Sequence, residues 1–188
     1  MKKYTSRTDS STYRLLLLIV MAGTTMLYAL SMTLVNIILP QLQGALSATQ
    51  EQISWVITLN VLATAIATPL TGSLVSMFGR RPVLILCSSC FTFATLACGF
   101  CDSLETLLIF RVIQGASGAP LMPLCQATLL QSYPRELHAK VNGVFGMAIV
   151  VGPALAPSLG GYLSETYDWR WVFFMMFPLG LMAVIGNW

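Results

Sequence analysis

The sequence predicts an all-α membrane protein with six transmembrane helices, and three observations lead to this prediction. The chain of 188 residues is 56% hydrophobic and 9% charged, whereas soluble domains carry roughly 25% charged residues. Six apolar runs each approach the roughly 20 residues that a helix needs to cross a bilayer. Because the backbone must satisfy its own hydrogen bonds in hydrocarbon, each run is expected to be helical. The runs cover residues 15–39, 52–75, 82–101, 105–131, 139–163 and 171–188.

The positions of the basic residues predict the direction in which the chain crosses the membrane. An excess of basic residues marks the cytoplasmic side, and eight of the ten fall on one side if the runs alternate in direction. We therefore expect a cytoplasmic N-terminal tail over residues 1–14 and a membrane unit over residues 15–188. The net charge of +3 reflects this anchoring at the lipid bilayer, so we expect no nucleic-acid partner. The eight residues are Lys2, Lys3, Arg7, Arg14, Arg80, Arg81, Arg135 and Lys140.

The first run carries polar side chains at helical spacing. Thr24, Tyr28 and Ser31 share one face of a helix, and Asn36 lies at the edge of that face. Polar residues inside a span usually face the interior of the bundle, so these four are candidate cavity residues. Helix–helix hydrogen bonds alone are the alternative explanation.

A short basic turn joins the second and third runs. Gly72 is expected to let the second helix approach a neighbour closely, and Gly79 to take the positive φ that a tight turn needs. Arg80 and Arg81 then lie at the headgroups, and Pro82 suits the first position of the third helix. A turn that serves only as an anchor is the alternative.

The third run contains four cysteines whose spacing excludes a shared zinc site. On one helix Cys87 and Cys101 lie roughly 21 Å apart along the axis, whereas zinc holds each sulfur at about 2.3 Å. Cys125 belongs to the fourth run. We expect these cysteines to be small buried residues, and we expect neither a metal nor a cofactor.

The fourth run carries a deep charge. Arg111 lies roughly 10 Å inside the outer boundary of its helix, where a charge is expensive and is a functional candidate by default. A side chain that bends back to the headgroups is the alternative. Small and polar residues share its helix face, so this face should meet protein or a water-filled cavity. They are Gln114, Gly115, Gly118, Met122 and Cys125.

The fifth run is rich in glycine and proline, and the sixth is short. Gly152, Ala156 and Gly160 recur every four residues and predict a close helix contact. Pro153 and Pro157 each remove a backbone hydrogen bond and favour a bend, and Gly161 completes the pattern. The sixth run starts near Trp171 and stops at Trp188 without a basic anchor. We therefore expect this span to be truncated and the parent chain to continue.

Three motifs resemble the signatures of the major facilitator superfamily. Residues 72–81 resemble its loop Gly-x-Leu-x-Asp-x-x-Gly-Arg-Arg/Lys, with Ser76 at the acidic position. Residues 111–118 match its Arg-x-x-Gln-Gly-x-x-Gly element. Residues 148–161 resemble its antiporter signature, with Ala148 in place of the first glycine. The resemblance implies the N-terminal half of a major facilitator fold, completed by a C-terminal half.

Further residues resemble the drug:proton antiporters with fourteen spans, in particular the EmrB-type multidrug exporters. Residues 30–40 match their first span at Thr33, Val35, Asn36, Leu39 and Pro40, but Ser31 replaces an aspartate. The resemblance implies a secondary active transporter in the bacterial inner membrane. It would export small lipophilic molecules by alternating access, driven by the proton gradient. A periplasmic adaptor and an outer-membrane channel are implied partners.

The resemblance also implies roles for the motif residues. The loop with Gly72, Gly79, Arg80 and Arg81 would help to close the cytoplasmic gate, and Arg111 would take part in proton coupling. None of the seven acidic residues is expected at membrane depth, although a proton carrier normally needs a buried carboxylate. The other half therefore supplies this group, or coupling runs differently, or the protein is inactive. The absence favours neutral or weakly acidic substrates.

Three other functions remain as alternatives. An intramembrane enzyme is disfavoured, because the sequence holds neither His-Glu-x-x-His nor Gly-x-Ser-x-Gly. An inactive or partial membrane fragment that needs a second half is favoured by the abrupt end of the sixth run. An importer of another solute within the same superfamily is opposed by the glycine and proline pattern of the fifth run.

Overall fold

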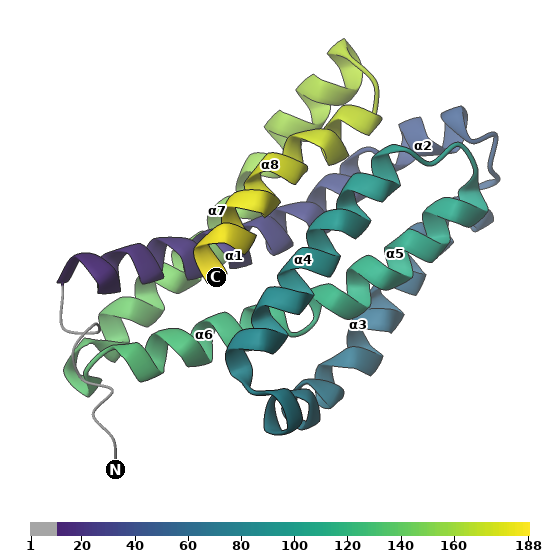
Figure 1. The fold of residues 1–188 in the computed structure, drawn as a ribbon. Helices are drawn as coiled ribbons and strands as arrows, with labels where there is room; N and C mark the ends of the chain where they lie inside the picture. Colours follow the sequence, from purple (N-terminus) through teal and green to yellow (C-terminus); the bar gives the residue numbers. More distant parts are fainter. Residues whose placement is uncertain (1–10) are drawn as a thin grey trace.

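A computed structural model of the protein describes residues 11–188, and these residues form helices without a strand. Six helical segments are long and apolar enough to cross a membrane, as the composition predicted. Residues 1–10, with Lys2, Lys3 and Arg7, lie outside the described residues. In chain order the helices are α1 (Ser11–Ile37), α2 (Leu39–Ala45), α3 (Gln50–Phe78), α4 (Arg80–Gly99), α5 (Leu104–Gly118), α6 (Leu121–Ser132), the 3₁₀ turn η1 (Arg135–Leu137), α7 (His138–Thr166) and α8 (Arg170–Asn187) (Figure 1).

The fourth span differs from the single helix that the sequence predicted. It consists of α5 and α6, which are separated at Ala119 and Pro120. Pro120 and Pro123 lack a backbone N–H, so the ladder of hydrogen bonds along the helix axis is interrupted here. The predicted helix face is correct up to the break and at Cys125, which is buried. It is wrong at Met122, which lies after the break and is 37% exposed.

Several ends of helices also differ from the predicted runs. The first helix begins at Ser11 inside the predicted tail, and residues 39–45 form the separate helix α2. Helix α3 begins after Thr49, whose hydroxyl accepts a hydrogen bond from the backbone N–H of Gln52 in a capping box. Helix α4 begins at Arg80, so Pro82 is its third residue and not its first. Proline still fits there, because the first N–H groups of a helix have no partner within it.

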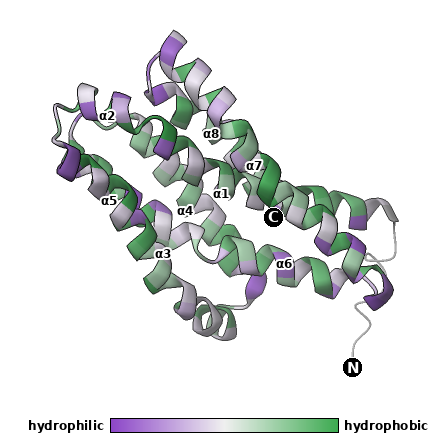
Figure 2. Ribbon diagram, turned by 180° about the vertical axis from the view of Figure 1, so that it is seen from behind, coloured by the Kyte–Doolittle hydropathy of each residue, from purple (hydrophilic) through white to green (hydrophobic). Residues whose placement is uncertain are grey.

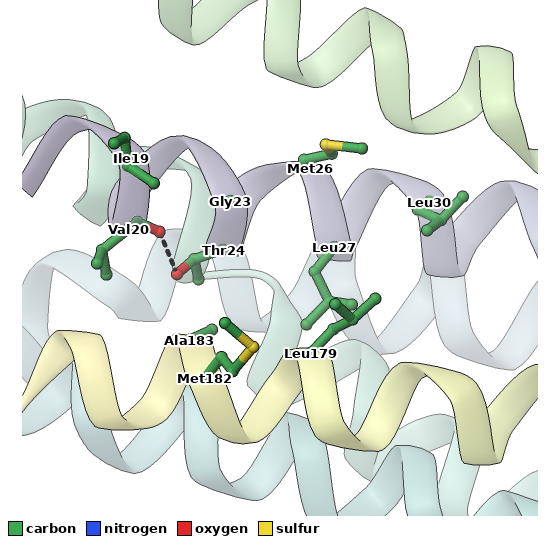
Figure 3. A pocket seen from close by; sticks show the side chains of 10 residues that line it. All are labelled: Ile19, Val20, Gly23, Thr24, Met26, Leu27, Leu30, Leu179, Met182 and Ala183. Atoms are coloured by element: carbon green, nitrogen blue, oxygen red, sulfur yellow. Dashed lines mark hydrogen bonds between the residues drawn. The ribbon is translucent and has the colours of Figure 1, made fainter. Parts of the chain in front are cut away.

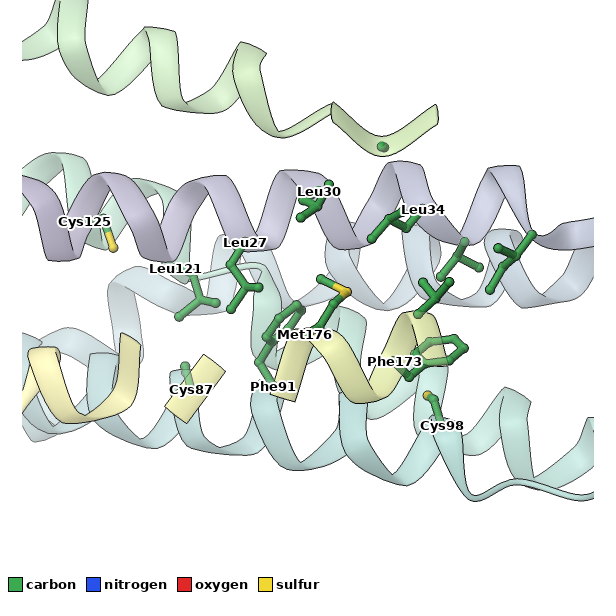
Figure 4. Close-up of a cluster of buried hydrophobic side chains, with 14 of the residues drawn as sticks. Leu27, Leu30, Leu34, Cys87, Phe91, Cys98, Leu121, Cys125, Phe173 and Met176 are labelled. Carbon is green, nitrogen blue, oxygen red and sulfur yellow. The ribbon is translucent and has the colours of Figure 1, made fainter. Parts of the chain in front are cut away.

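The spans pack in three main pairs, α1 with α7, α3 with α5 and α4 with α8, while α4 also packs on α5. A core of buried side chains fills the space between α1, α4 and α8, with Leu34, Phe91, Phe173 and Met176 at its centre (Figure 4). Aliphatic and aromatic side chains fill this core at close contact, and their burial holds the helices in register.

Hydrophobic residues, drawn in green, predominate along the long helices (Figure 2), and many of them lie on the outside of the bundle. Large hydrophobic side chains such as Ile66, Val150 and Ile185 are 60%, 67% and 74% exposed. Exposed apolar surface of this extent is typical of a protein surrounded by lipid. Helices α3 and α7 are the least covered of the spans, since 17% and 22% of their most apolar stretches are buried.

Candidate functional site

The guanidinium group of Arg111 lies inside the bundle. The side chain is 1% exposed, its Nε donates a hydrogen bond to the carbonyl oxygen of Val56 on α3 at 3.2 Å, and its Nη1 donates to Oε1 of Gln114. The prediction that Arg111 faces protein is confirmed. The alternative, a side chain that bends back to the headgroups, is wrong because the guanidinium is enclosed and hydrogen-bonded within the chain.

Gln114 connects the arginine to two further helices. It is fully buried, and its Nε2 donates hydrogen bonds to Oγ of Ser31 on α1 at 3.2 Å and to Oγ1 of Thr95 on α4 at 2.7 Å. An amide has both donors and acceptors, so Gln114 can accept from a guanidinium and donate to two hydroxyls at once. Ser31, predicted from the first span, thus meets Arg111 through this amide.

Asn60 on α3 holds the backbone of α5 next to Arg111. Its Nδ2 donates a hydrogen bond to the carbonyl oxygen of Arg111 at 2.8 Å, and one turn further along α3 the hydroxyl of Thr64 donates to the carbonyl oxygen of Gly115 at 3.1 Å. A Cβ atom at Gly115 would lie 2.3 Å from the carbonyl oxygen of Asn60. Glycine is therefore what allows α3 and α5 to approach so closely.

The hydrogen-bonded polar side chains of this region, all of them buried except the half-buried Thr64, are named here the Arg111 cluster. Asn60, Thr64 and Thr95 were not predicted as members, although their signal was in the sequence. Each is a polar residue in an otherwise apolar run, and polar residues in spans usually face the interior. The cluster consists of Arg111, Gln114, Ser31, Asn60, Thr64 and Thr95.

No carboxylate accompanies the buried charge within residues 11–188. All six acidic residues of this range are exposed, so carbonyl and amide oxygens alone stabilise the guanidinium. The effective cost of burying an ion in a protein is several kcal/mol unless polar groups compensate it. Oδ1 of Asn60 is buried and has no hydrogen-bond partner among the described residues. The six acids are Glu51, Asp102, Glu105, Glu136, Glu165 and Asp168.

Two other polar residues of the first span lie apart from the cluster. Thr24 is 2% exposed and donates a hydrogen bond to the carbonyl oxygen of Val20 at 2.8 Å (Figure 3). Asn36 is exposed, and its Nδ2 donates to the carbonyl oxygen of Met32 at 3.0 Å. Asn36 follows Ser31 by five residues, which places it about 140° around the helix. The prediction that these residues face the interior is confirmed for Thr24 and is wrong for Asn36, and neither hydrogen-bonds to Arg111 or Gln114 among the described residues.

Tyr28 contributes packing between helices. Its ring meets Phe91 edge-on with the ring centres 5.9 Å apart. A Cβ atom at Gly118 would lie 2.5 Å from Cε2 of this ring. Tyr28 therefore fills the space that glycine leaves on α5, next to the cluster but without a hydrogen bond to its members in the described part of the chain.

The turn between α3 and α4 has the predicted backbone. Gly79 adopts a φ of 86°, in the left-handed region that favours glycine. Nη1 of Arg80 donates a hydrogen bond to the carbonyl oxygen of Ala127 on α6 at 3.3 Å, while Arg81 is exposed. Arg80 thus ties the turn to the fourth span, whereas the side chain of Arg81 is exposed at the surface.

Gly72 does not make the predicted close contact within the described residues. A Cβ atom there would meet no atom within 4 Å, because the face of α3 that carries Gly72 is not covered by another helix of this chain. The hydroxyl of Ser76, at the acidic position of the loop motif, donates to the carbonyl oxygen of Ser73 at 2.8 Å.

The small residues of α7 form the predicted contact surface, and α1 covers it. A Cβ atom at Gly152 would lie 2.8 Å from the carbonyl oxygen of Met26, and one at Gly160 would lie 3.0 Å from Cδ2 of Leu34. Ala156, between these glycines, is fully buried. The close helix contact predicted for these three residues is confirmed.

Three other residues of this motif, Pro153, Pro157 and Gly161, are not part of the close contact described above for Gly152, Ala156 and Gly160. Pro153 and Pro157 lie inside α7, which continues through both, and a functional bend at these prolines stays a prediction. Gly161 meets no atom within 4 Å of its Cβ position among residues 11–188. It therefore does not take part in the contact with α1.

A charged contact joins the connections at the opposite end of the bundle from the α3–α4 turn. Nη2 of Arg170 donates hydrogen bonds to Oδ1 of Asp102 at 2.9 Å and to the carbonyl oxygen of Cys101 at 3.2 Å. The guanidinium also stacks on the ring of Trp169, with 4.6 Å between Cζ and the ring centre. These contacts hold the α4–α5 connection against the start of α8.

The geometry can be compared with known proteins. The sequence model of the Major Facilitator Superfamily matches residues 21–188. The chain belongs to the major facilitator superfamily. It is 39% identical over 174 residues to the multidrug export protein EmrB of Haemophilus influenzae, which covers 93% of this chain and 34% of that protein. It is also 35% identical over 159 residues to the fatty acid resistance protein FarB of Neisseria gonorrhoeae, and this match covers 85% of this chain and 31% of FarB.

Solved structures share the fold of this major facilitator chain. The proton:xylose symporter XylE superposes with a TM-score of 0.83 at 15% identity, covering 93% of this chain and 44% of that one. A bacterial homologue of the lysosomal transporter Spinster gives a TM-score of 0.77 at 22% identity, covering 95% and 43%. The likeness shows the fold of an N-terminal major facilitator half. The chain spans about a third of the length of the curated relatives it matches.

Proposed function

We propose that this chain is the N-terminal six-helix half of a secondary active transporter that exports small lipophilic molecules from the cell by alternating access. The observation that carries the proposal is the Arg111 cluster, which joins α1, α3, α4 and α5 through buried hydrogen bonds. Four helices joined in this way move as one body, and alternating access requires such a body to rock against a second one. The relative from Haemophilus influenzae is named a multidrug export protein.

The poorly covered helices support a second half as the partner. Much of α3 and α7 is uncovered within this chain, and small residues such as Gly72, Gly143 and Gly146 have space above them. A C-terminal half would pack against these two helices. In this arrangement the N-terminus and the α3–α4 turn lie on the cytoplasmic side of the bacterial inner membrane, where basic residues are enriched. The turn then closes the gate on that side.

The charge of the cluster supports neutral or weakly acidic lipophilic substrates. Arg111 carries a positive charge without a carboxylate beside it, and Ser31 provides a hydroxyl where the antiporter motif has an acid. A fixed positive charge repels cations and attracts anions. The relative FarB is named a fatty acid resistance protein. The titrating carboxylate for proton coupling would come from the second half, and a periplasmic adaptor and an outer-membrane channel would carry the substrate onward.

The export of a fluorescent lipophile from cells or inverted vesicles tests this function. Arg111→Ala is expected to abolish export driven by the proton gradient, because the bundle loses its one deep charge and the side-chain hydrogen bonds of Arg111 to Val56 and Gln114. Lys140→Ala is the matched control, since Lys140 is an exposed cation at the start of α7. Circular dichroism and gel filtration would show that both variants fold. Normal export by Arg111→Ala would contradict the proposal, as would a preference for cations over anions of equal size.

A further inference from the structure

Two cysteines lie at the end of α4 that the proposed orientation places on the periplasmic side. Cys98 belongs to the last turn of the helix, and Cys101 follows the end of the helix at Gly99. The backbone N–H of Phe100 donates a hydrogen bond to the carbonyl oxygen of Ala97 at 3.0 Å, and that of Cys101 donates to the carbonyl oxygen of Cys98 at 3.4 Å. The chain therefore continues to turn as a helix does up to Cys101.

The spacing of these two cysteines fits a disulfide bond. Residues three apart on a helical turn have Cα atoms about 5 Å from each other, and a disulfide needs about 4.4–6.8 Å between its Cα atoms. Cys98 is 0% and Cys101 4% exposed, and both belong to the same buried core, in which Figure 4 shows Cys98. Sγ of Cys101 lies 3.3 Å from the carbonyl oxygen of Ala97. This thiol therefore turns back toward the last turn of α4, which carries Cys98.

A second Cys-x-x-Cys pair in the middle of α4 shows what the position at the helix end adds. Cys87 is buried, as predicted for the cysteines, but Cys90 is exposed, so the two side chains face different surroundings. Their Cβ atoms lie about 5–6 Å apart in a regular helix, whereas a disulfide needs about 3.5–4.5 Å. Helical backbone on both sides holds them at that separation. Cys101 lies beyond the helix, so its backbone is able to close the remaining distance.

We propose that Cys98 and Cys101 form a disulfide bond in the connection between α4 and α5. The periplasm is oxidising, and disulfides persist there but are rare in the cytosol. The position of this connection in the periplasm rests on the orientation given under the proposed function. The bond would crosslink the turn that holds the start of α8, because the carbonyl oxygen of Cys101 accepts a hydrogen bond from Arg170.

The bond forms by thiol–disulfide exchange with a disulfide-bearing oxidant. The thiolate of Cys101 attacks one sulfur of the oxidant, whose S–S bond breaks, and a mixed disulfide results. The thiolate of Cys98 then attacks the sulfur of Cys101 and releases the second sulfur of the oxidant. Two electrons and the two thiol protons pass to the oxidant, which leaves as a dithiol.

Burial decides when this exchange takes place. Burial raises the pKa of the Cys101 thiol above its usual value, so that less of it is the reactive thiolate. Exchange is therefore fastest while the protein is being inserted, before α8 packs against α4. Once the helices are packed, the same burial shields the S–S bond from reductants.

The redox state of the cysteines in cells tests the proposal. Free thiols are trapped in acid and blocked with a maleimide, the disulfides are then reduced and given a second label, and both labels are mapped by mass spectrometry. We expect at least about tenfold more second label on Cys98 and Cys101 than on Cys87 and Cys90. Cys98→Ser should leave Cys101 without the second label, whereas Cys87→Ser, the matched control in the same helix, should leave the bond intact.

Oxidation of the purified protein tests the geometry without a compartment. The reduced protein in detergent is held for hours in a mixture of reduced and oxidised glutathione. We expect an internal disulfide between Cys98 and Cys101 and no lasting glutathione adduct. An adduct that persists on Cys101 would show that Cys98 does not reach it.

Three results would overturn the inference: free thiols at Cys98 and Cys101 in cells, equal second label on all four cysteines of α4, or a lasting glutathione adduct. Free thiols in cells together with a disulfide in the purified protein would contradict the proposed orientation as well. These measurements need no transport. A protein that carries the bond but exports nothing therefore contradicts only the proposed export, and export by a protein with both thiols free contradicts only the disulfide.

Discussion

The Arg111 cluster and the loop-motif segment 72–82, which comprises the end of α3, Gly79 and the start of α4, differ in how many of their residues find contacts within this chain. Arg111, Gln114 and Ser31 are at most 1% exposed and hydrogen-bond to one another and to neighbouring helices. Around the turn, Gly72 meets no atom of the described residues at its Cβ position and Arg81 is exposed. Both segments match a family motif. One is complete within the chain, while the other leaves a surface on which a partner can pack.

This contrast predicts different responses to substitution. A change inside the cluster should lower the stability of this chain without abolishing its fold, because the contacts of the cluster are all present here. A change at the turn should leave the chain stable and affect only a process that involves a second body. The following predictions compare the cluster with contacts at the two ends of the bundle, from the largest expected effect to the smallest.

The largest effect is expected at the contact between α3 and α5. Gly115→Leu places a side chain where a Cβ atom already lies 2.3 Å from the carbonyl oxygen of Asn60, so the two helices must separate. We expect a loss of about 3 kcal/mol of unfolding free energy. The measurement is unfolding in mixed micelles followed by circular dichroism. Gly143→Leu, at an open position of α7, should change stability by less than about 0.5 kcal/mol.

A smaller loss is expected when the amide that holds Arg111 is removed. Asn60→Leu leaves the carbonyl oxygen of Arg111 without the donor that now lies at 2.8 Å, at a cost of about 1–2 kcal/mol. It should also lower export several-fold, because Arg111 is no longer fixed to α3. Thr64→Val removes a bond to the same helix one turn away. Equal losses of export in both variants would mean that Asn60 acts only through stability.

Tyr133 provides a contact whose strength depends on pH. Its hydroxyl donates a hydrogen bond to the carbonyl oxygen of Arg14 at 2.6 Å, and burial raises the pKa of the phenol above its usual value, while Arg14 opposes the shift. Since the folded pKa is raised, the contribution is present below about pH 10 and is lost as pH rises through the folded pKa. Tyr133→Phe should lose about 1 kcal/mol at neutral pH. The difference from the original chain should vanish in strong base.

The smallest effect is expected at the contact between Arg170 and Asp102, at the end of the bundle opposite the α3–α4 turn. Arg170→Ala removes the pair with Asp102, which is 2.9 Å long but has a carboxylate that is 91% exposed. Exposed pairs contribute about 0.2–1 kcal/mol and weaken with salt. The measurement is the free energy of unfolding of the variant and of the original chain at low salt and at 1 M salt. The difference between the two free energies should become smaller at high salt. A difference in unfolding free energy that grew with salt would contradict an electrostatic origin of this contribution.

The sequence predicted the spans and the buried faces well where one helix carries all the information. The spacing of Gly152, Ala156 and Gly160 identified a contact surface, and the depth of Arg111 identified an interior charge, because period and composition alone decide both. The structure confirms these residues as buried or closely packed.

Other features needed knowledge of which helix lies beside which. Asn60 and Thr95 are partners of Arg111 and Gln114 only because α3 and α4 pack on α5, and helical period does not identify a neighbour. Gly72 looked like a contact residue, but its face of α3 is uncovered here. Pro120 is a sequence signal for the break between α5 and α6. The prediction missed it because the apolar run continues past Pro120 and has the length of a single span.

The accessibility of two serines tests the central contrast most directly. In a chain whose five cysteines are replaced by serine, Ser31→Cys lies in the cluster and Ser76→Cys lies in the last turn of α3, within the loop motif. A membrane-impermeant maleimide should label Cys at position 76 rapidly from the cytoplasmic side and Cys at position 31 from neither side. Rapid labelling at position 31, or labelling at position 76 from outside the cell, would contradict the account.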